Sequence, residues 1–143
     1  MNMASSALAL PLVGMLTLTM AVWIFMFIRR MSYISANKLD AEEMKTPADV
    51  QRLIPDQVAS PGHNLKNLFE LPVVFYALCL YLMGASQVDD VHVYCAWTFL
   101  AFRILHSIIH CGYNRVVHRF AAYLIASVAL WVMVVRALMA AAV

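Results

Sequence analysis

The sequence predicts an all-α integral membrane protein that folds as a four-helix bundle. Of its 143 residues, 64% are hydrophobic and 13% are charged, whereas a typical soluble domain is about 45–50% apolar and about 25% charged. Four apolar stretches each come close to the ~20 residues that a helix needs to cross the hydrocarbon core. One of these stretches carries three basic side chains on a single helical face, where contact with lipid would be unfavourable. We therefore expect the bundle to enclose a polar site.

The four expected transmembrane helices form one domain that covers residues 1–143. The first helix spans about residues 7–28 and is followed by Arg29 and Arg30. It is longer than the core of a signal peptide, no basic residue precedes it, and no small-residue cleavage site follows it. We therefore expect it to remain in the mature protein. The other three helices are expected at about residues 65–84, 91–111 and 120–135.

A polar loop of residues 29–63 separates the first two helices. We expect a short helix at Pro47–Leu53 and chain stops at Pro55 and Pro61, because proline interrupts helices. The simplest interpretation is a solvated connector. A loop of this length can also act as a lid over a site.

The basic residues predict the orientation of the chain in the membrane. They concentrate in the first loop and in the turn between the third and fourth helices, whereas the turn between the second and third helices offers only Asp89 and Asp90. Positively charged loops stay in the cytoplasm, so we expect both basic loops there and both termini on the opposite side. Arg136 is the one charge that disagrees. A composition rich in Met and Ala favours a bacterial inner membrane, although an endoplasmic-reticulum membrane would impose the same physical constraints. The net charge of +2 suggests no nucleic-acid partner.

The third helix carries the most informative side chains, namely Arg103, His106 and His110. Counted inward at 1.5 Å per residue, Glu70 lies roughly 9 Å deep, Arg103 roughly 12 Å and His106 roughly 7–8 Å. Asn67 precedes Glu70 by three residues, so the two are expected to share a helix face. If this face meets that of Arg103, Glu70 and Arg103 can neutralise each other as an ion pair.

Two interpretations of this polar face remain open. A buried ion pair could simply fix the helix register, although such a pair is weak evidence for stability because desolvation can cancel the Coulombic gain. The surplus of donors favours an anionic ligand site instead, because His63, Lys66 and Asn67 add to those of the third helix. A metal site is disfavoured, since the i, i+4 pair His106 and His110 would need further ligands and the nearby arginine would repel a cation.

Two motifs resemble those of one membrane family. Residues 67–72 read N-x-x-E-L-P, and residues 103–106 on the next helix read R-x-x-H. Together they resemble the membrane-associated proteins in eicosanoid and glutathione metabolism, the MAPEG family. The resemblance implies a homotrimer of four-helix subunits that binds glutathione between neighbouring protomers near the cytoplasmic side. Members include glutathione transferases and peroxidases, lipid-mediator synthases, and a non-enzymatic lipid-binding relative.

The resemblance also implies a set of site residues. Arg119 matches the arginine beside the glutathione sulfur, and such a cation lowers the ordinary thiol pKa of about 8.5. Residues in the matching glutathione-binding positions are Arg29, Lys66, Asn67, Glu70, Arg103, His106, His110 and Tyr123.

Several positions depart from the family pattern. Lys66 and His63 stand where arginine is usual, His110 replaces a tyrosine, and Phe120 replaces a serine that assists thiol chemistry in one branch. A lysine offers a point charge where arginine offers a planar fork, so carboxylate binding should weaken.

The resemblance thus implies a glutathione-dependent transferase or peroxidase that acts on lipophilic electrophiles or hydroperoxides. The lipophilic substrate would enter from the lipid between the first and fourth helices of adjacent subunits. The alternative is a non-catalytic protein of the same fold, either lipid-binding or an accessory subunit of a larger membrane complex. A metal-dependent oxidase that uses His106 and His110 is a third and weaker hypothesis.

Overall fold

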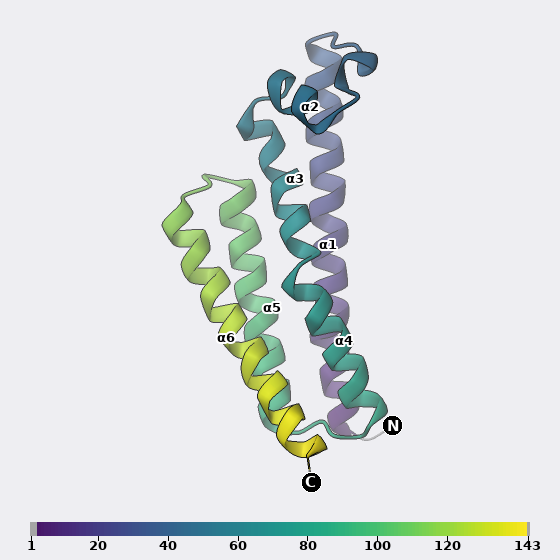
Figure 1. Cartoon of the computed structure of the whole chain (residues 1–143), viewed down its shortest axis with the longest axis vertical. Helices are drawn as coiled ribbons and strands as arrows, with labels where there is room; N and C mark the ends of the chain where they lie inside the picture. Colours follow the sequence, from purple (N-terminus) through teal and green to yellow (C-terminus); the bar gives the residue numbers. More distant parts are fainter. Residues whose placement is uncertain (1–2, 143) are drawn as a thin grey trace.

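The computed structural model describes residues 3–142, and those residues form helices and connecting loops with no strand. Two short elements, η1 and α2, separate the first long helix from the rest (Figure 1). In chain order the elements are α1 (Met3–Ala36), η1 (Ala41–Met44), α2 (Pro47–Leu53), α3 (Asp56–Leu68), α4 (Leu71–Gly84), α5 (Asp90–Cys111) and α6 (Val116–Ala141).

Four segments are long and apolar enough to cross a membrane, and α3 and α4 together make the second of them. The described chain is therefore an all-α integral membrane four-helix bundle, as the composition predicts. Both termini lie at one end of the bundle, whereas η1, α2 and the turn between α5 and α6 lie toward the other end (Figure 1). We call this second end the loop end.

Two helices are longer than their apolar stretches. Helix α1 continues past Arg29 to Ala36 and is roughly 51 Å long at 1.5 Å per residue, which exceeds the ~30 Å of the hydrocarbon core. Helix α6 runs over Val116–Ala141 rather than residues 120–135. The residues beyond the apolar stretches are more polar, but none of them is a proline. The backbone hydrogen bonds of both helices therefore continue past the point where hydropathy falls.

The second membrane segment begins at Asp56, nine residues before the predicted start at Leu65. Pro55 interrupts the chain between α2 and α3, as predicted, and occupies the N-cap position of α3. The stop predicted at Pro61 is wrong, because Pro61 is buried inside α3. A proline there removes one helical hydrogen bond, and packing of the buried side chain offsets that loss. The short helix at Pro47–Leu53 forms as predicted, with the Thr46 side chain capping it.

A break between α3 and α4 interrupts this segment inside the bundle. Pro72 has no N–H, and its ring would clash with the carbonyl of Leu68 in a continuous helix. The chain leaves the helix at Phe69 and Glu70, where Glu70 adopts φ −97° and ψ −106°, and resumes at Leu71. The break places the Glu70 side chain in an exposed position beside the buried residues of α3.

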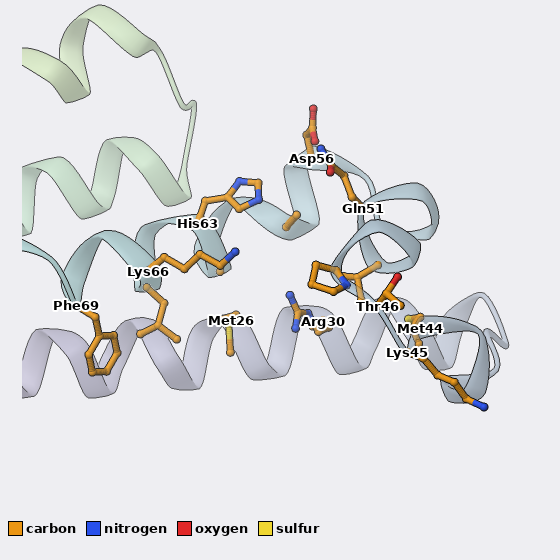
Figure 2. A pocket seen from close by; sticks show the side chains of 15 residues that line it. Met26, Arg30, Met44, Lys45, Thr46, Gln51, Asp56, His63, Lys66 and Phe69 are labelled. Atoms are coloured by element: carbon orange, nitrogen blue, oxygen red, sulfur yellow. The ribbon is translucent and has the colours of Figure 1, made fainter.

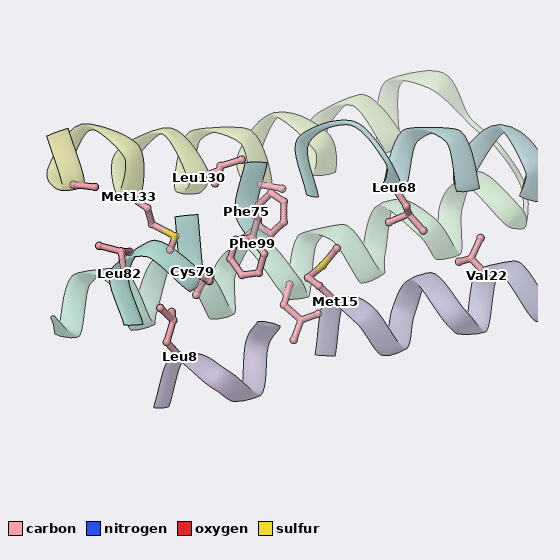
Figure 3. Packing of buried hydrophobic residues seen from close by; sticks show 14 residues of the cluster. Leu8, Met15, Val22, Leu68, Phe75, Cys79, Leu82, Phe99, Leu130 and Met133 are labelled. Atoms are coloured by element: carbon pink, nitrogen blue, oxygen red, sulfur yellow. The ribbon is translucent and has the colours of Figure 1, made fainter. Parts of the chain in front are cut away.

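The core lies where all the long helices meet (Figure 3). Phe75 of α4 stacks on Phe99 of α5 with 4.5 Å between ring centroids, and Met15 of α1 and Leu130 of α6 are fully buried in the same cluster. Large apolar side chains on the outer faces, such as Trp131, are exposed. Outward-facing apolar residues are what helices need when lipid surrounds them.

Arg136, the charge that disagrees with the predicted orientation, is neutralised at the end opposite to the loop end. Its guanidinium forms an ion pair with Asp89, with Nε 3.1 Å from Oδ2. Asp89 also caps α5 by accepting a hydrogen bond from the His92 N–H at 2.9 Å. Burial raises the pKa of Asp89, but the hydrogen bonds from His92 and Arg136 and their charges lower the pKa more, so it lies below its usual value.

Replacement of Asp89 by asparagine is expected to lower the stability of the bundle at neutral pH and not at acidic pH. Asparagine keeps the helix cap but loses the attraction to Arg136. Because the pKa of Asp89 is lowered in the fold, its charge stabilises the fold above the unfolded pKa of about 3.9, and this contribution is lost as pH falls through the folded value. Thermal unfolding in detergent from pH 7 to pH 3 checks this. A difference between the two proteins that is independent of pH would contradict it.

Candidate functional site

Arg103 of α5 is the centre of a buried polar cluster. Its side chain is 0% exposed, and Nη2 donates a hydrogen bond of 3.1 Å to the backbone carbonyl of Asn67 in α3. The guanidinium carbon lies 5.8 Å from the centre of the Tyr123 ring on α6. Nε and Nη1 have no hydrogen-bond partner among the described residues. Most of the donor capacity of this buried cation is therefore unused.

Asn67 and Glu70 meet across the helix break rather than along one helix face. Asn67 lies in the last turn of α3 and Glu70 precedes α4, and the Asn67 amide donates to the Glu70 carboxylate at 2.6 Å. The ion pair considered for Glu70 and Arg103 does not form as a direct contact, because the ion pairs within residues 3–142 do not include it. The break turns the carboxylate outward, and Arg103 holds the Asn67 carbonyl instead.

His106 and His110 extend the cluster along α5 toward the loop end. They are 4% and 8% exposed, and their rings meet edge to face with centroids 5.4 Å apart. His106 Nδ1 lies 2.8 Å from the backbone carbonyl of Arg119, which can only accept, so that nitrogen is the donor. His106 Nε2 and His110 Nδ1 have no partner among the described residues. Both rings therefore offer polar atoms that the fold does not use.

Arg119 is held in place at the start of α6. Its Nη1 donates to the side-chain oxygen of Asn114 at 2.5 Å, and Asn114 turns the chain with φ 51°, a conformation that asparagine tolerates better than most residues. The Arg119 side chain is half-buried, and its backbone joins the cluster through His106. A cationic group thus lies in a fixed position at the edge of the polar cluster.

Three buried polar residues next to the cluster are not among the site residues predicted from the sequence. Ser60 donates to the His110 carbonyl, Ser107 donates to Asn64 Oδ1 at 3.4 Å, and the Asn64 amide contacts the Cys111 sulfur at 3.5 Å. Ser60, Asn64 and Asn67 are spaced i, i+4 and i+7, which places them on one helical stripe. That spacing could have identified Ser60 and Asn64, but the expected helix begins only at Leu65, and no such signal marks Ser107.

Two predicted site residues lie away from the cluster. Arg29 of α1 donates to the Cys111 carbonyl at 3.3 Å and packs over Phe25, so it links α1 to the end of α5. Lys66 is exposed and lines a separate cavity with Arg30. The contacts within the cluster thus join Asn67, Glu70, Arg103, His106, His110, Arg119 and Tyr123.

The cluster favours an anionic or polar ligand over a cation. Within the described residues, no group of three or more His, Cys, Asp and Glu side chains is arranged to hold a metal ion. A buried charge without partners is strongly unfavourable, so an anion near Arg103 would stabilise the site. Glu70 and the free nitrogen of His106 offer acceptors nearby. A ligand that carries both carboxylates and an amine would suit this combination.

A comparison with known families matches residues 8–139 of the chain to the MAPEG family. The chain matches no curated protein and no solved structure. The family match covers nearly the whole chain, including both motifs and all but the outermost residues of the four membrane segments. The chain therefore belongs to the MAPEG family.

Proposed function

We propose that this protein is a glutathione-dependent transferase or peroxidase that acts on lipophilic electrophiles or hydroperoxides. The observation that carries the proposal is the buried guanidinium of Arg103, whose Nε and Nη1 lack partners among the described residues. A fold that served only to fix helix register would pair such a group, because an unpaired buried charge is destabilising. Membership of a family that includes glutathione-dependent enzymes supports the same conclusion.

The exposed side of the cluster is suited to bind the charged end groups of glutathione. Glu70 is exposed and oriented by Asn67, so its carboxylate can accept hydrogen bonds from an ammonium group. Arg103 acts as a positioning residue, because it fixes the Asn67 carbonyl and supplies positive charge from the buried side of the cluster. Arg29 and Lys66 do not join the cluster within one chain. We propose that a neighbouring copy in a homotrimer completes the site and that these two cations serve there.

Arg119 is the proposed catalytic residue. A bound glutathione would supply the thiol that attacks an electrophile or reduces a hydroperoxide. A guanidinium beside that sulfur stabilises the thiolate and lowers the thiol pKa toward neutrality. The hydrogen bond from Arg119 to Asn114 fixes the guanidinium before substrate binds, so little reorganisation is needed during the reaction. The outward-facing apolar side chains of α1 and α6 would admit a lipophilic partner directly from the bilayer.

We also propose that the loop end faces the cytoplasm, where reduced glutathione is available. The basic residues of the first loop and of the turn between α5 and α6 support this orientation. Arg136, which pairs with Asp89 at the opposite end, is outnumbered by the basic residues of the loop end.

Calorimetric titration of detergent-purified protein with glutathione tests the binding step. We expect saturable binding that weakens about tenfold or more in Glu70→Gln, because a hydrogen bond to a charged group contributes about 1.5–3 kcal/mol. Glu43→Gln is the matched control, because Glu43 is an exposed carboxylate in η1 outside the cluster. Equal affinities in wild type and Glu70→Gln would contradict the assigned role of Glu70.

One observation favours a non-catalytic protein as the second candidate function. Phe120, at the position where one branch of the family has a serine, is 59% exposed and offers no polar group. A lipid-binding or accessory member would retain the fold and the buried cluster without activating a thiol. Glutathione binding without any thiolate signal would favour this candidate.

A further inference from the structure

A separate cavity of about 590 Å³ lies at the loop end between α1, the η1–α2 loop and α3 (Figure 2). Its size falls within the range of roughly 300–1,000 Å³ that is typical of ligand pockets. Polar and apolar side chains both line it, including Arg30, His63, Lys66, Asp56, Met26 and Phe69. Apart from Lys66, none of the residues proposed to bind glutathione contributes to this wall.

The charged side chains of this cavity are mainly basic, and within the described residues Arg30 has no ion-pair partner. The buried Nε of Arg30 has no hydrogen-bond partner among these residues either. Lys45 pairs with Glu42 at 2.8 Å and points away from Arg30 (Figure 2). Asp56 is the one carboxylate in the lining.

Gly62 of α3 makes room for the Arg30 guanidinium. A Cβ atom at this position would lie 3.4 Å from Arg30 Nη2 and 3.6 Å from the Met26 sulfur. Any side chain larger than alanine would therefore extend into the space that Arg30 and Met26 border. The glycine keeps the cationic part of the cavity open.

An apolar cavity of about 410 Å³ continues along α1 toward the membrane interior. The two cavities share Leu65 and Phe69 in their walls. The hydroxyl groups of Thr19 and Tyr76 in the second cavity lie 3.3 Å apart and can satisfy each other. Leu16, Met20 and Trp23 in this wall are exposed on the outer surface of α1. We call the two cavities together the α1 groove.

We propose that the α1 groove binds an anionic phospholipid of the bilayer, with its phosphate at Arg30 and one acyl chain in the apolar cavity. Arginine forms paired hydrogen bonds with phosphate, and basic pockets between membrane helices suit anionic head groups. The apolar cavity is lined by residues on the lipid-facing side of α1, so the ligand comes from the bilayer rather than from solution. Arg30, which holds the phosphate, is not among the residues proposed to bind glutathione.

Quenching of Trp23 fluorescence tests the proposal, because Trp23 lines the apolar cavity. A background with Trp97→Phe and Trp131→Phe leaves Trp23 as the single tryptophan. This protein is placed in phosphatidylcholine nanodiscs that contain spin-labelled phosphatidylglycerol or spin-labelled phosphatidylcholine. We expect the phosphatidylglycerol probe to quench Trp23 at a mole fraction at least about fivefold lower than the phosphatidylcholine probe does.

Arg30→Gln is expected to abolish this preference, and Arg52→Gln is the matched control that keeps it, because Arg52 is an exposed arginine in α2 outside the groove. Gly62→Leu fills the cavity without removing a charge and should also abolish the preference, which keeps the test decisive if Arg30→Gln does not fold. Equal quenching by both probes, or a preference that survives in both groove variants, would overturn the proposal. So would stronger quenching by a spin-labelled fatty acid, or loss of the preference on addition of inorganic phosphate.

Discussion

Replacing Arg119 with alanine is expected to lower the rate of glutathione conjugation about 100-fold or more while glutathione still binds. Loss of a preorganised group that stabilises developing negative charge typically reduces the rate by about 10²–10³, and Arg119 is fixed for such a role by Asn114. The thiol of bound glutathione should then ionise near its ordinary pKa of about 8.5. Conjugation to an aryl halide and the ultraviolet absorbance of the thiolate measure the two effects.

Arg115→Ala is the control for this experiment. Arg115 is an exposed arginine that precedes α6, one turn before Arg119, and its side chain makes no capping hydrogen bond. We expect its rate to stay within about twofold of wild type. An unchanged rate in Arg119→Ala, or an equal loss in both variants, would mean that Arg119 does not activate the thiol.

Replacing Arg103 with methionine is expected to weaken glutathione binding at least about tenfold without lowering the melting temperature. Substitution of a buried ionic group by an apolar residue of similar size is often neutral or stabilising, and here two of the guanidinium nitrogens have no partner to lose. The variant does lose the hydrogen bond to the Asn67 carbonyl, worth about 1 kcal/mol. Calorimetry and thermal unfolding measure the two quantities on the same preparation.

Arg136→Met provides the opposite pattern as a control. Arg136 pairs with Asp89 at the far end of the bundle, so its loss should reduce stability and leave glutathione affinity unchanged. If Arg103→Met instead unfolds at a clearly lower temperature and binds glutathione as wild type does, Arg103 fixes the helix register and its proposed role in the site is wrong.

The class of fold could be predicted from the sequence because bilayer physics restricts the choices. A chain of this composition must satisfy its backbone within helices, and the four apolar stretches locate them. The helix ends were less predictable, because hydropathy reports where the lipid ends and not where the backbone hydrogen bonds end. The continuation of α1 from Arg29 to Ala36 is an example.

The polar cluster could be predicted only in part from depths counted along the helices. Depth counting placed Glu70, Arg103 and His106 at similar levels, and the contacts join all three to one cluster. That count applies to a continuous helix, however, and after the break that Pro72 imposes Glu70 is hydrogen-bonded to Asn67 and forms no ion pair with Arg103 among the described residues. The proline was visible in the motif, so the break could have been predicted. The hydrogen bond from Arg103 to the Asn67 carbonyl could not, since it depends on how α3 packs against α5.

Lys66 illustrates a second limit. Its neighbour Asn67 contacts Arg103, but consecutive residues on a helix point about 100° apart, and Lys66 faces the α1 groove instead. A sequence motif does not reveal which positive charges converge on one ligand within a single chain. Lys66 matches a glutathione-binding position of the family, yet within one chain its side chain lines a separate cavity.

The most direct test of the central claim is a pH titration of the thiolate absorbance of glutathione bound to the wild-type protein. We expect saturable binding and an apparent thiol pKa clearly below the value of about 8.5 for a free thiol. No binding at millimolar glutathione, or a bound thiol that titrates as it does in free solution, would contradict the claim that this polar cluster binds glutathione and activates its sulfur.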